Sequence, residues 1–371
     1  MSDAFALATP DAVEEPICFG TYRVLGRIAE GGMGLVLRGQ DMRSGRQVAI
    51  KTVRSPRVSD AAAIRREIVA LSNLCHPGIV RLYAHGVSTG MPWMAMELLA
   101  GCTLGEEMSW YWPEPARSDE PRARTDEVPT APACGLRDRA VDQGQRLFPA
   151  AGGGHLAEVF STVAQICLAL DHLHRHGMVH RDVKPANVFL RDDGRTTLFD
   201  SGLACSASSP RGSELCVGTM EYAAPEQICG FPVDRRADIY SLGCLLYELV
   251  TGRPPFRGDS SSEIAERQMK REPVAPSHLI ADVPGQLEDL VMSMLAKTPA
   301  HRPDSAIEVG QRLASIARRT QQVSGAPIDR HLFQLRHEEG EGGGRAGSTP
   351  ELGLRRLPAR PRWGSPPATA G

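Results

Sequence analysis

The chain contains 371 residues, which is enough for one large domain with additional segments. Its composition, 42% hydrophobic and 23% charged, is ordinary for a soluble globular protein. The net charge of −2 gives no reason to expect nucleic acid or an anionic membrane as a general partner. The nine cysteines are scattered without a C-x-x-C pair, which argues against a disulfide framework or a zinc site and favours reduced thiols.

The N-terminal segment, residues 1–18, is expected to be a short flexible leader. It carries acidic residues and no apolar core, so its composition is not that of a signal peptide. No stretch of the chain is expected to reach the ~18 apolar residues of a membrane span. Together these features predict a cytoplasmic protein without membrane association.

Residues 19–98 are predicted to form a small lobe rich in β-structure. Short apolar segments separated by turn residues predict five strands. The predicted strands lie around residues 22–28, 36–37, 48–53, 79–82 and 93–96. Between the third and fourth, Ser59 is placed to cap a helix in which Ile64, Ile68 and Leu71 recur at helical spacing.

The region 105–154 interrupts this pattern. It is rich in Pro, Arg, Asp, Ala and Gly and lacks periodicity, which predicts a disordered insert. Its run Trp110-Tyr111-Trp112 has two interpretations. Clustered aromatic residues are usually buried, which favours a short helix packed locally. The alternative is a docking patch for a regulatory partner.

A larger helical lobe is predicted over about residues 155–317. Apolar residues recurring from Leu156 to Leu173 predict a long amphipathic helix. Two short strands are predicted around 188–190 and 196–199, and further helices are predicted near 238–249, 262–270, 287–295 and 306–317. The Gly-, Pro- and Arg-rich tail, residues 318–371, is expected to be disordered, and a regulatory partner binding there stays open.

The run from His180 to Asn187 reads H-R-D-V-K-P-A-N. It places a carboxylate (Asp182), an ammonium group (Lys184) and an amide (Asn187) close together on one loop. Phosphoryl transfer from ATP to a hydroxyl needs an acceptor that orients the hydroxyl, a cation for the moving phosphoryl group and an oxygen ligand for Mg²⁺. The loop therefore indicates a phosphotransferase.

Other motifs accompany this loop in a fixed order. They are a glycine-rich run at Ile28–Val36, Val48-Ala49-Ile50-Lys51, Glu67 on the predicted helix, Asp200-Ser201-Gly202, Ala224-Pro225-Glu226, Asp238 and Arg302. The whole set resembles the protein kinase family. The residues within the motifs are most similar to those of bacterial eukaryotic-type serine/threonine protein kinases. The resemblance covers about Phe19 to Ala317, apart from the insert. It implies an α+β fold with a β-rich small lobe and a helical large lobe.

The resemblance also implies roles for individual residues. The catalytic set would be Asp182, Lys184, Lys51 and Glu67, with ATP and Mg²⁺ as cofactors and Ser/Thr side chains of proteins, its own included, as acceptors. Mg²⁺ would be held by Asn187 and Asp200. The residues expected to contact ATP are Ile28, Ala29, Glu30, Gly31, Gly32, Met33, Gly34, Val36, Ala49, Lys51, Met96, Glu97, Leu99, Lys184, Asn187 and Asp200.

Several further residues would have structural roles by the same resemblance. Glu226 should pair with Arg302, and Asp238 should hold the backbone of the catalytic loop. His180 is interpreted as a packed histidine rather than a base. Thr219 would support Asp182, and Leu190 or a neighbour would line the adenine site.

The sequence departs from the family pattern at Ser201, where the family has a phenylalanine that couples the lobes. Losing a buried ring costs on the order of 3–5 kcal/mol where a cavity remains, so a resting state biased towards inactivity is expected. Phe199 is placed to refill part of that space. Replacing Ser201 by Phe should raise basal activity.

This departure keeps a pseudokinase, which would bind nucleotide without turnover, as the alternative function. The presence of every catalytic residue favours the enzyme. A small-molecule phosphotransferase is disfavoured by the complete activation segment, which runs from Asp200 to Glu226. Within it, Ser213 is a candidate phosphorylation site whose phosphate would pair with Arg181. The alternative is a serine-rich flexible loop that is not modified.

Overall fold

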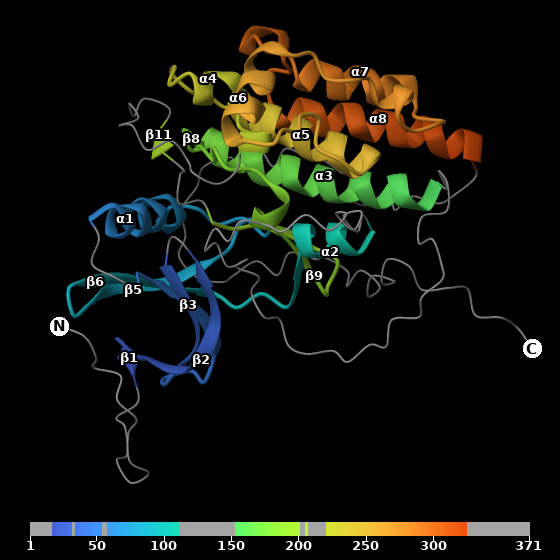
Figure 1. Ribbon diagram of the computed structural model, residues 1–371. Helices are drawn as coiled ribbons and strands as arrows, with labels where there is room; N and C mark the ends of the chain where they lie inside the picture. Colours follow the sequence, from blue (N-terminus) through green and yellow to red (C-terminus); the bar gives the residue numbers. More distant parts are fainter. Residues whose placement is uncertain are drawn as a thin grey trace, which may run out of the picture. The chain divides into compact units, whose positions relative to one another are not determined.

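The computed structural model describes residues 17–31, 34–53, 58–111, 153–200, 205–206 and 220–324. They belong to two compact units. The first contains Met1–Arg65 and Leu82–Leu98 as far as they are described, and the second contains Arg66–Arg81 and the described residues from Leu99 onward. The predicted α+β fold class is confirmed, with an antiparallel sheet in the first unit and mainly helices in the second (Figure 1).

The first unit is built on a six-stranded antiparallel sheet in the order β1-β2-β3-β4-β6-β5. Its strands are β1 (Cys18–Phe19), β2 (Tyr22–Gly31), β3 (Gly34–Asp41), β4 (Gln47–Thr52), β5 (Leu82–Ser88) and β6 (Met91–Glu97). The sheet begins one residue earlier than the small lobe predicted from the sequence. The backbone N–H of Val24 also donates to the carbonyl of Ile17, so the end of the predicted leader is part of the fold.

The two faces of this sheet carry different side chains because successive residues of a strand point to opposite sides. One face forms the core of the unit, where Phe19 and Tyr22 pack their rings against Trp93 at centroid distances of 6.1 and 5.9 Å. The other members of this core are Leu37, Val48, Ile50 and Ala95. The opposite face carries Lys51 and its cross-strand neighbours Val36 and Met94.

Helix α1 (Val58–Ser72) is divided between the two units after Arg65. The predicted residues Ile64, Ile68 and Leu71 are all buried on it. The predicted cap is wrong, because the helix begins at Val58 and Ser59 lies inside it. The strand predicted at 79–82 is also displaced. Ile79 forms an isolated bridge to Leu198, and β5 begins only at Leu82.

The second unit is mainly helical. Its helices are α2 (Leu104–Tyr111), α3 (Gly153–Arg175), α4 (Pro225–Ile228), α5 (Arg236–Thr251), α6 (Ser261–Lys270), α7 (Gly285–Met294) and α8 (Ala306–Ser324). The described part of this unit also contains four 3₁₀ turns, η1 (Pro185–Asn187), η2 (Met220–Tyr222), η3 (Pro276–His278) and η4 (Pro299–His301). Two small sheets complete the unit, formed by β7 (Gly101–Thr103), β9 (Val188–Arg191) and β10 (Thr196–Leu198), and by β8 (Met178–Val179) and β11 (Cys205–Ser206).

Helix α3 is the centre of this unit, with α8 and α5 packed beside it (Figure 1). Its residues Val159, Phe160, Val163 and Leu170 have no exposed surface. By length and composition alone, Leu156–Arg175 is apolar enough to cross a membrane, which corrects the expectation that no stretch would be. Because these apolar side chains are buried in the fold, α3 is a core helix.

Two segment boundaries differ from the predictions. The region interpreted as a disordered insert contains helix α2, so the helical interpretation of Trp110 and Tyr111 is confirmed for the backbone. Helix α8 continues seven residues beyond the predicted end at Ala317, to Ser324. Residues 112–152 and 325–371 lie outside the described residues, so the order or disorder predicted for them is untested.

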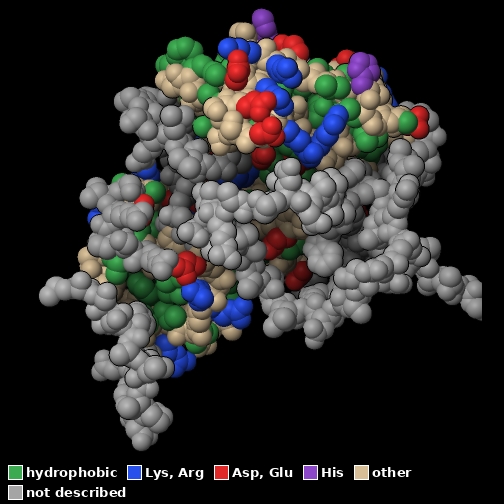
Figure 2. Space-filling view, viewed as in Figure 1, with side chains coloured by type: hydrophobic (Ala, Val, Ile, Leu, Met, Phe, Trp, Pro, Cys, Tyr) green, Lys and Arg blue, Asp and Glu red, His purple; other side chains and the backbone are tan. Residues whose placement is uncertain are grey.

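On the face shown in Figure 2, the charged side chains of the described residues form no large patch of one sign. Lys and Arg side chains are interspersed there with Asp and Glu side chains. This mixture agrees with the net charge of −2.

Candidate active site

The loop between β8 and β9 brings together two predicted catalytic residues, Asp182 and Lys184, and the predicted metal ligand Asn187. Oδ2 of Asp182 accepts a hydrogen bond from Nδ2 of Asn187 at 2.8 Å and lies 3.0 Å from Nζ of Lys184. Nδ2 of Asn187 also donates to the backbone carbonyl of Asp182 at 2.9 Å. The side chains of Asp182 and Lys184 are 14% and 19% exposed, so both reach solvent while their orientation is held.

This loop is fixed by a buried carboxylate from α5. Oδ2 of Asp238 accepts the backbone N–H of His180 at 2.8 Å, and Oδ1 accepts that of Arg181 at 2.7 Å. Arg181 has a φ of 66°, a left-handed conformation that is costly for a residue with a side chain. The two hydrogen bonds stabilise that conformation, so the prediction that Asp238 holds the loop is confirmed.

Asp238 stays ionised although it is fully buried. Burial alone would raise its pKa, but the hydrogen bond from Nε2 of His174, at 2.8 Å, and the charges of His174 and His180 outweigh this effect. The net result is a pKa below the usual value. A charged carboxylate is the stronger acceptor for the two backbone N–H groups of the loop.

A second contact to the loop comes from the end of the activation segment. Nε2 of Gln227 donates to the carbonyl of Arg181 at 3.0 Å. The adjacent Glu226 forms a bidentate ion pair with Arg302 at 2.7 and 2.9 Å, as predicted. Arg302 also donates to the carbonyls of Ala296, Arg236 and Lys297, so this buried guanidinium is fully hydrogen-bonded.

The predicted metal ligands lie next to each other in the backbone. The N–H of Phe199 donates to the carbonyl of Asn187 at 3.2 Å, which places Asp200 beside Asn187. Because Asp182 engages Nδ2 of Asn187, the amide oxygen is the end of that side chain able to ligate a cation. Amide and carboxylate oxygens are ligands that Mg²⁺ takes, so the two residues fit this ion.

No group of three or more His, Cys, Asp or Glu side chains in the described segments could hold a metal by itself. Mg²⁺ commonly completes its shell with phosphate oxygens and water. A site of two protein ligands therefore suits a nucleotide-bound Mg²⁺ better than a resident metal.

In the first unit, the predicted nucleotide residues share the face of the sheet opposite its core. Lys51 pairs with Val36 across β3 and with Met94 across β6, and Ala49 pairs with Met96. Cross-strand partners lie on the same face, so an amine and a row of apolar side chains occur together there. A flat apolar surface ending at a cation is suited to a purine that carries phosphates.

The glycine hairpin joins β2 to β3, with Gly31 paired with Gly34. A Cβ on Gly34 would lie 2.4 Å from the carbonyl oxygen of Thr52, and the φ of 148° is one that other residues rarely adopt. Glycine is therefore required at this position, where the start of β3 approaches the backbone of Thr52 at the end of β4. The two predicted residues at the tip, Gly32 and Met33, lie outside the described residues.

Lys51 and Glu67 are both buried, with 8% and 1% of their surfaces exposed. They fall in different compact units, so their ion pair stays a prediction. Other residues predicted to contact ATP lie in β2, namely Ile28, Ala29 and Glu30. Glu97 is the last residue of β6, and Leu99 follows two positions later. Ser201, Ser213 and Thr219 lie outside the described residues.

Other structural predictions have clear outcomes. His180 is 1% exposed, as expected for a packed histidine. Leu190 is 6% exposed, and its place in the adenine site stays a prediction. Phe199 packs edge-on against Phe189 at a centroid distance of 6.0 Å. The prediction that Phe199 refills the space of the phenylalanine ring missing at position 201 is untested, because Ser201 lies outside the described residues.

Two supporting residues were missed in the sequence. His174 bonds to Asp238 across 64 positions of sequence, and Gln227 bonds to Arg181 across 46. No local pattern indicates such distant partners. The position of His174 in the last turn of the long predicted helix was the only signal present.

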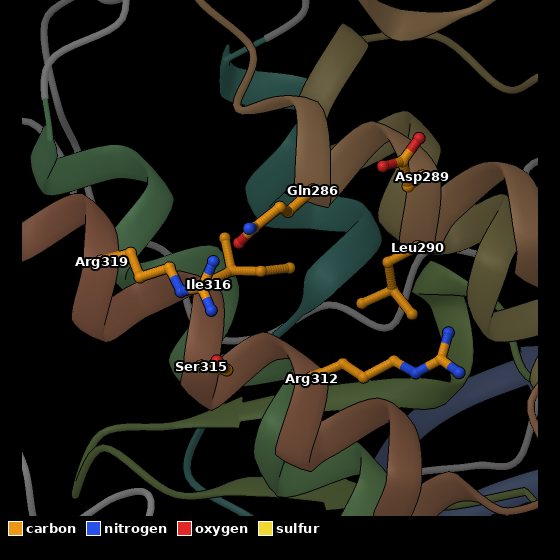
Figure 3. Close-up of a pocket in the computed structure, with 7 residues that line it drawn as sticks. All are labelled: Gln286, Asp289, Leu290, Arg312, Ser315, Ile316 and Arg319. Atoms are coloured by element: carbon orange, nitrogen blue, oxygen red, sulfur yellow. The ribbon is translucent and has the colours of Figure 1, made fainter.

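A separate cavity of about 310 Å³ lies at helices α7 and α8 (Figure 3). Its lining residues are Gln286, Asp289, Leu290, Arg312, Ser315, Ile316 and Arg319. None of them belongs to the predicted site, and Arg312 is paired with Glu308 at 2.6 Å. The cavity is therefore distinct from the candidate active site.

Comparison with known proteins agrees with this geometry. The sequence pattern of the protein kinase domain matches residues 22–123 and 142–312. A probable serine/threonine-protein kinase of Streptomyces coelicolor is 34% identical over 309 residues, covering 80% of this chain and 40% of that protein. The serine/threonine-protein kinase PknB of Mycolicibacterium smegmatis is 33% identical over 325 residues, covering 81% and 46%.

A third relative is matched over more of its length. The serine/threonine-protein kinase PknL of Mycobacterium tuberculosis is 34% identical over 314 residues, covering 83% of this chain and 69% of the relative. The chain thus spans less than half the length of the first two relatives and about two thirds of the third.

Proposed function

Because the chain belongs to the protein kinase domain family, we propose that it transfers the γ-phosphoryl group of ATP to serine and threonine hydroxyls of proteins, including its own. The observation that carries this proposal is the position of Asp182 between Asn187 and Lys184. The names of the relatives, all serine/threonine-protein kinases, support the same choice of acceptor.

Asp182 orients the acceptor hydroxyl and accepts its proton. Both of its side-chain contacts within the described residues involve Oδ2. Oδ1 is therefore available to accept a hydrogen bond from an incoming hydroxyl. Because its contacts hold Oδ2 in place, the direction in which Oδ1 points is also fixed. A fixed Oδ1 orients the acceptor hydroxyl for attack, and such orientation increases the rate.

Lys184 supplies positive charge at the same point. Its ammonium group lies 3.0 Å from Asp182, so a hydroxyl bound to the carboxylate would be close to the cation. The transferred phosphoryl group carries charge on its three outer oxygens during the reaction. A fixed ammonium group stabilises that charge without reorganisation.

Asn187 and Asp200 hold Mg²⁺ in this proposal. When bound, the ion neutralises phosphate charge and fixes the orientation of the γ-phosphoryl group. Asn187 couples the orientation of Asp182 to the binding of Mg²⁺ in this proposal. Its nitrogen positions Asp182, and its oxygen is the proposed ligand of the ion.

The nucleotide would lie on the free face of the first unit's sheet. Val36, Ala49 and Met96 contact the adenine, and the backbone of Glu97 and Leu99 bonds its edge. Lys51 contacts the phosphates, with Glu67 as its partner. The glycine hairpin covers the phosphates through its backbone N–H groups.

The protein substrates include the chain itself, and a regulatory partner binds the insert or the tail. We place the reaction in the cytoplasm. Cys18, Cys75, Cys167, Cys229 and Cys244 carry free thiols, which agrees with a reducing compartment.

The test is transfer of label from [γ-³²P]ATP with Mg²⁺ to the protein and to a generic Ser/Thr acceptor, followed by phosphoamino-acid analysis. The proposal predicts phosphoserine and phosphothreonine. Label confined to tyrosine would refute the acceptor assignment. Absence of transfer with ATP still bound would refute the enzyme.

A further inference from the structure

The cavity at helices α7 and α8 combines a buried apolar part with an exposed polar rim. Leu290 and Ile316, which are 3% and 4% exposed, line it from the two helices. Arg312 and Arg319 belong to the rim on α8, where both are exposed. At about 310 Å³ the cavity lies at the small end of the range for binding pockets, so it suits a few side chains rather than a whole cofactor.

Arg319 gives this rim a positive charge that can bind a carboxylate. Arg312 is paired with Glu308 at 2.6 Å, but Arg319 forms no ion pair with a carboxylate of the described residues. Asp289 also lines the cavity, and Figure 3 shows its carboxylate directed away from the two guanidinium groups. An arginine beside buried apolar side chains is suited to a peptide in which a carboxylate lies close to an apolar residue.

The sequence that follows α8 has the matching pattern. Helix α8 ends at Ser324, and residues 332–341 read L-F-Q-L-R-H-E-E-G-E. Three apolar residues precede three carboxylates in this segment, namely Leu332, Phe333 and Leu335 before Glu338, Glu339 and Glu341. Residues 325–371 contain five acidic residues, and three of them fall within positions 338–341. The segment is therefore the part of the tail that best complements an apolar cavity with a basic rim.

The covalent connection keeps this segment within reach of the cavity. Arg319 and Arg312 precede Ser324 by five and twelve residues, which is about 8 and 18 Å along a helix. Glu338 follows Ser324 by 14 residues, and a flexible chain of that length spans roughly 20 Å on average. Because the span matches these distances, the tether gives an effective concentration on the order of 1 mM. A contact with a Kd of about 0.1 mM would then be occupied roughly ten to one.

We propose that the cavity at α7 and α8 is a docking site for residues 332–341 of the same chain. An apolar side chain of the segment enters the cavity beside Leu290 and Ile316, and a carboxylate of the segment binds Arg319. Exposed ion pairs are individually weak, so the apolar contact and the tether contribute alongside the charge. A regulatory partner that binds the tail would have to displace the segment from this cavity.

Trypsin cleavage after Arg336, inside the segment, tests docking in the full chain. Cleavage needs the undocked segment, so it should be at least fivefold slower in wild type than in Arg319→Glu, whose tail has the same sequence. The matched control is Arg318→Glu, which changes the neighbouring exposed arginine that does not line the cavity and should match wild type. Cleavage after Arg345, outside the segment, should proceed at the same rate in all three proteins.

Thermal unfolding verifies that the three proteins are equally folded under the conditions of cleavage. Equal rates after Arg336 in wild type and Arg319→Glu would overturn the proposal. Protection that is lost equally in Arg318→Glu would also overturn it, because the general charge of α8 would then be responsible. Protection that increases with protein concentration would assign the cavity to the tail of a second copy and contradict docking within one chain.

A fluorescein-labelled peptide of residues 328–344 tests the same contact without proteolysis. Its anisotropy is followed as it is titrated with the full chain carrying Glu338→Gln and Glu339→Gln, in which the competing segment is weakened. The Kd should rise at least fivefold when the peptide carries the same two glutamines, or when the chain also carries Arg319→Glu. Equal Kd values would refute recognition of the carboxylates by Arg319. Because neither test measures phosphoryl transfer, their failure is distinguishable from failure of the proposed function.

Discussion

At the scale of single residues, Asn187 combines two roles that are usually separable. Its nitrogen bonds to the carboxylate and the backbone carbonyl of Asp182, and its oxygen is a proposed ligand of Mg²⁺. Removing the side chain therefore affects both the orientation of the base and the affinity for the ion.

Asn187→Ala should lower kcat by about 100-fold or more, because orientation of the reacting groups contributes at least this much. The Mg²⁺ concentration needed for half-maximal rate should rise in the same variant. The matched control is Asn73→Ala, which removes an exposed amide from a turn. An unchanged Mg²⁺ requirement in Asn187→Ala would contradict the ligand role.

His76 gives the second unit a sensitivity to acid. Its Nδ1 accepts the backbone N–H of Gly78 at 3.0 Å, so the ring must be unprotonated there. The ring stacks on His172 at 5.0 Å, and His172 contacts His176 at 4.5 Å. Burial and then the charge of His172 lower the pKa of His76 to about 4.

The sign of the effect follows from this lowered pKa. The folded protein favours neutral His76, so the contribution to stability is complete above the unfolded pKa of about 6.5 and is lost as the pH falls towards 4. Between pH 7 and pH 5 the loss should be roughly 2 kcal/mol.

Urea unfolding at pH 7 and pH 5 checks this prediction. His76→Asn keeps an acceptor for Gly78 but cannot titrate, so its stability should depend less on pH by about that amount. His278→Asn, which changes an exposed histidine, should behave as wild type. An equal loss of stability in wild type and His76→Asn would rule out His76 as the titrating group.

At the scale of elements, the β2–β3 hairpin depends on glycine at one position. Gly34→Ala would place Cβ 2.4 Å from the backbone oxygen of Thr52, whereas Gly26→Ala, on the same hairpin, meets nothing within 4 Å. Gly34→Ala should cost roughly 1–3 kcal/mol of stability and weaken ATP binding at least tenfold. Gly26→Ala should do neither, as judged by thermal unfolding and ATP titration. Equal ATP affinities of the two variants would contradict the role of the hairpin.

Most elements could be predicted because their periodicity is strong. The recurring apolar residues of α3 and the short apolar run of β4, which is buried from Val48 to Thr52, leave little choice of structure. A short helix was predicted at Trp110-Tyr111-Trp112 as one of two interpretations, but the start of α2 at Leu104 was not predicted although a signal was present. Thr103 and Glu106 form a capping box, in which Oγ1 of Thr103 accepts from Glu106 and the Glu106 carboxylate accepts from the Thr103 N–H.

The end of α8 could not be predicted from apolar spacing. Among the residues of α8 whose side chains are described, the last buried apolar one is Ala317, and the exposed Arg318 and Arg319 that follow have favourable helix propensity. The carboxylate, amine and amide of the site were predicted by type and spacing. His174 and Gln227 were not, because their contacts depend on the tertiary fold.

At the scale of the whole molecule, ligand binding should increase the free energy of unfolding. A ligand that binds only the folded state stabilises it by about 2.7 kcal/mol at 100 times its Kd. ATP with Mg²⁺ should therefore raise the Tm of the protein, and addition of a chelator should remove the Mg²⁺-dependent part. Asp200→Asn should keep the shift caused by ATP alone but lose the additional shift caused by Mg²⁺. A full Mg²⁺-dependent shift in Asp200→Asn would exclude Asp200 as a ligand.

The central claim is that Asp182, held by Asn187 and Lys184, carries the chemistry of phosphoryl transfer. The most direct measurement is kcat for a Ser/Thr acceptor at saturating ATP and Mg²⁺, for wild type and for Asp182→Ala, with ATP affinity measured separately. The account predicts a fall in kcat of roughly 100-fold or more with ATP affinity nearly unchanged. Equal kcat values for the two proteins would contradict it.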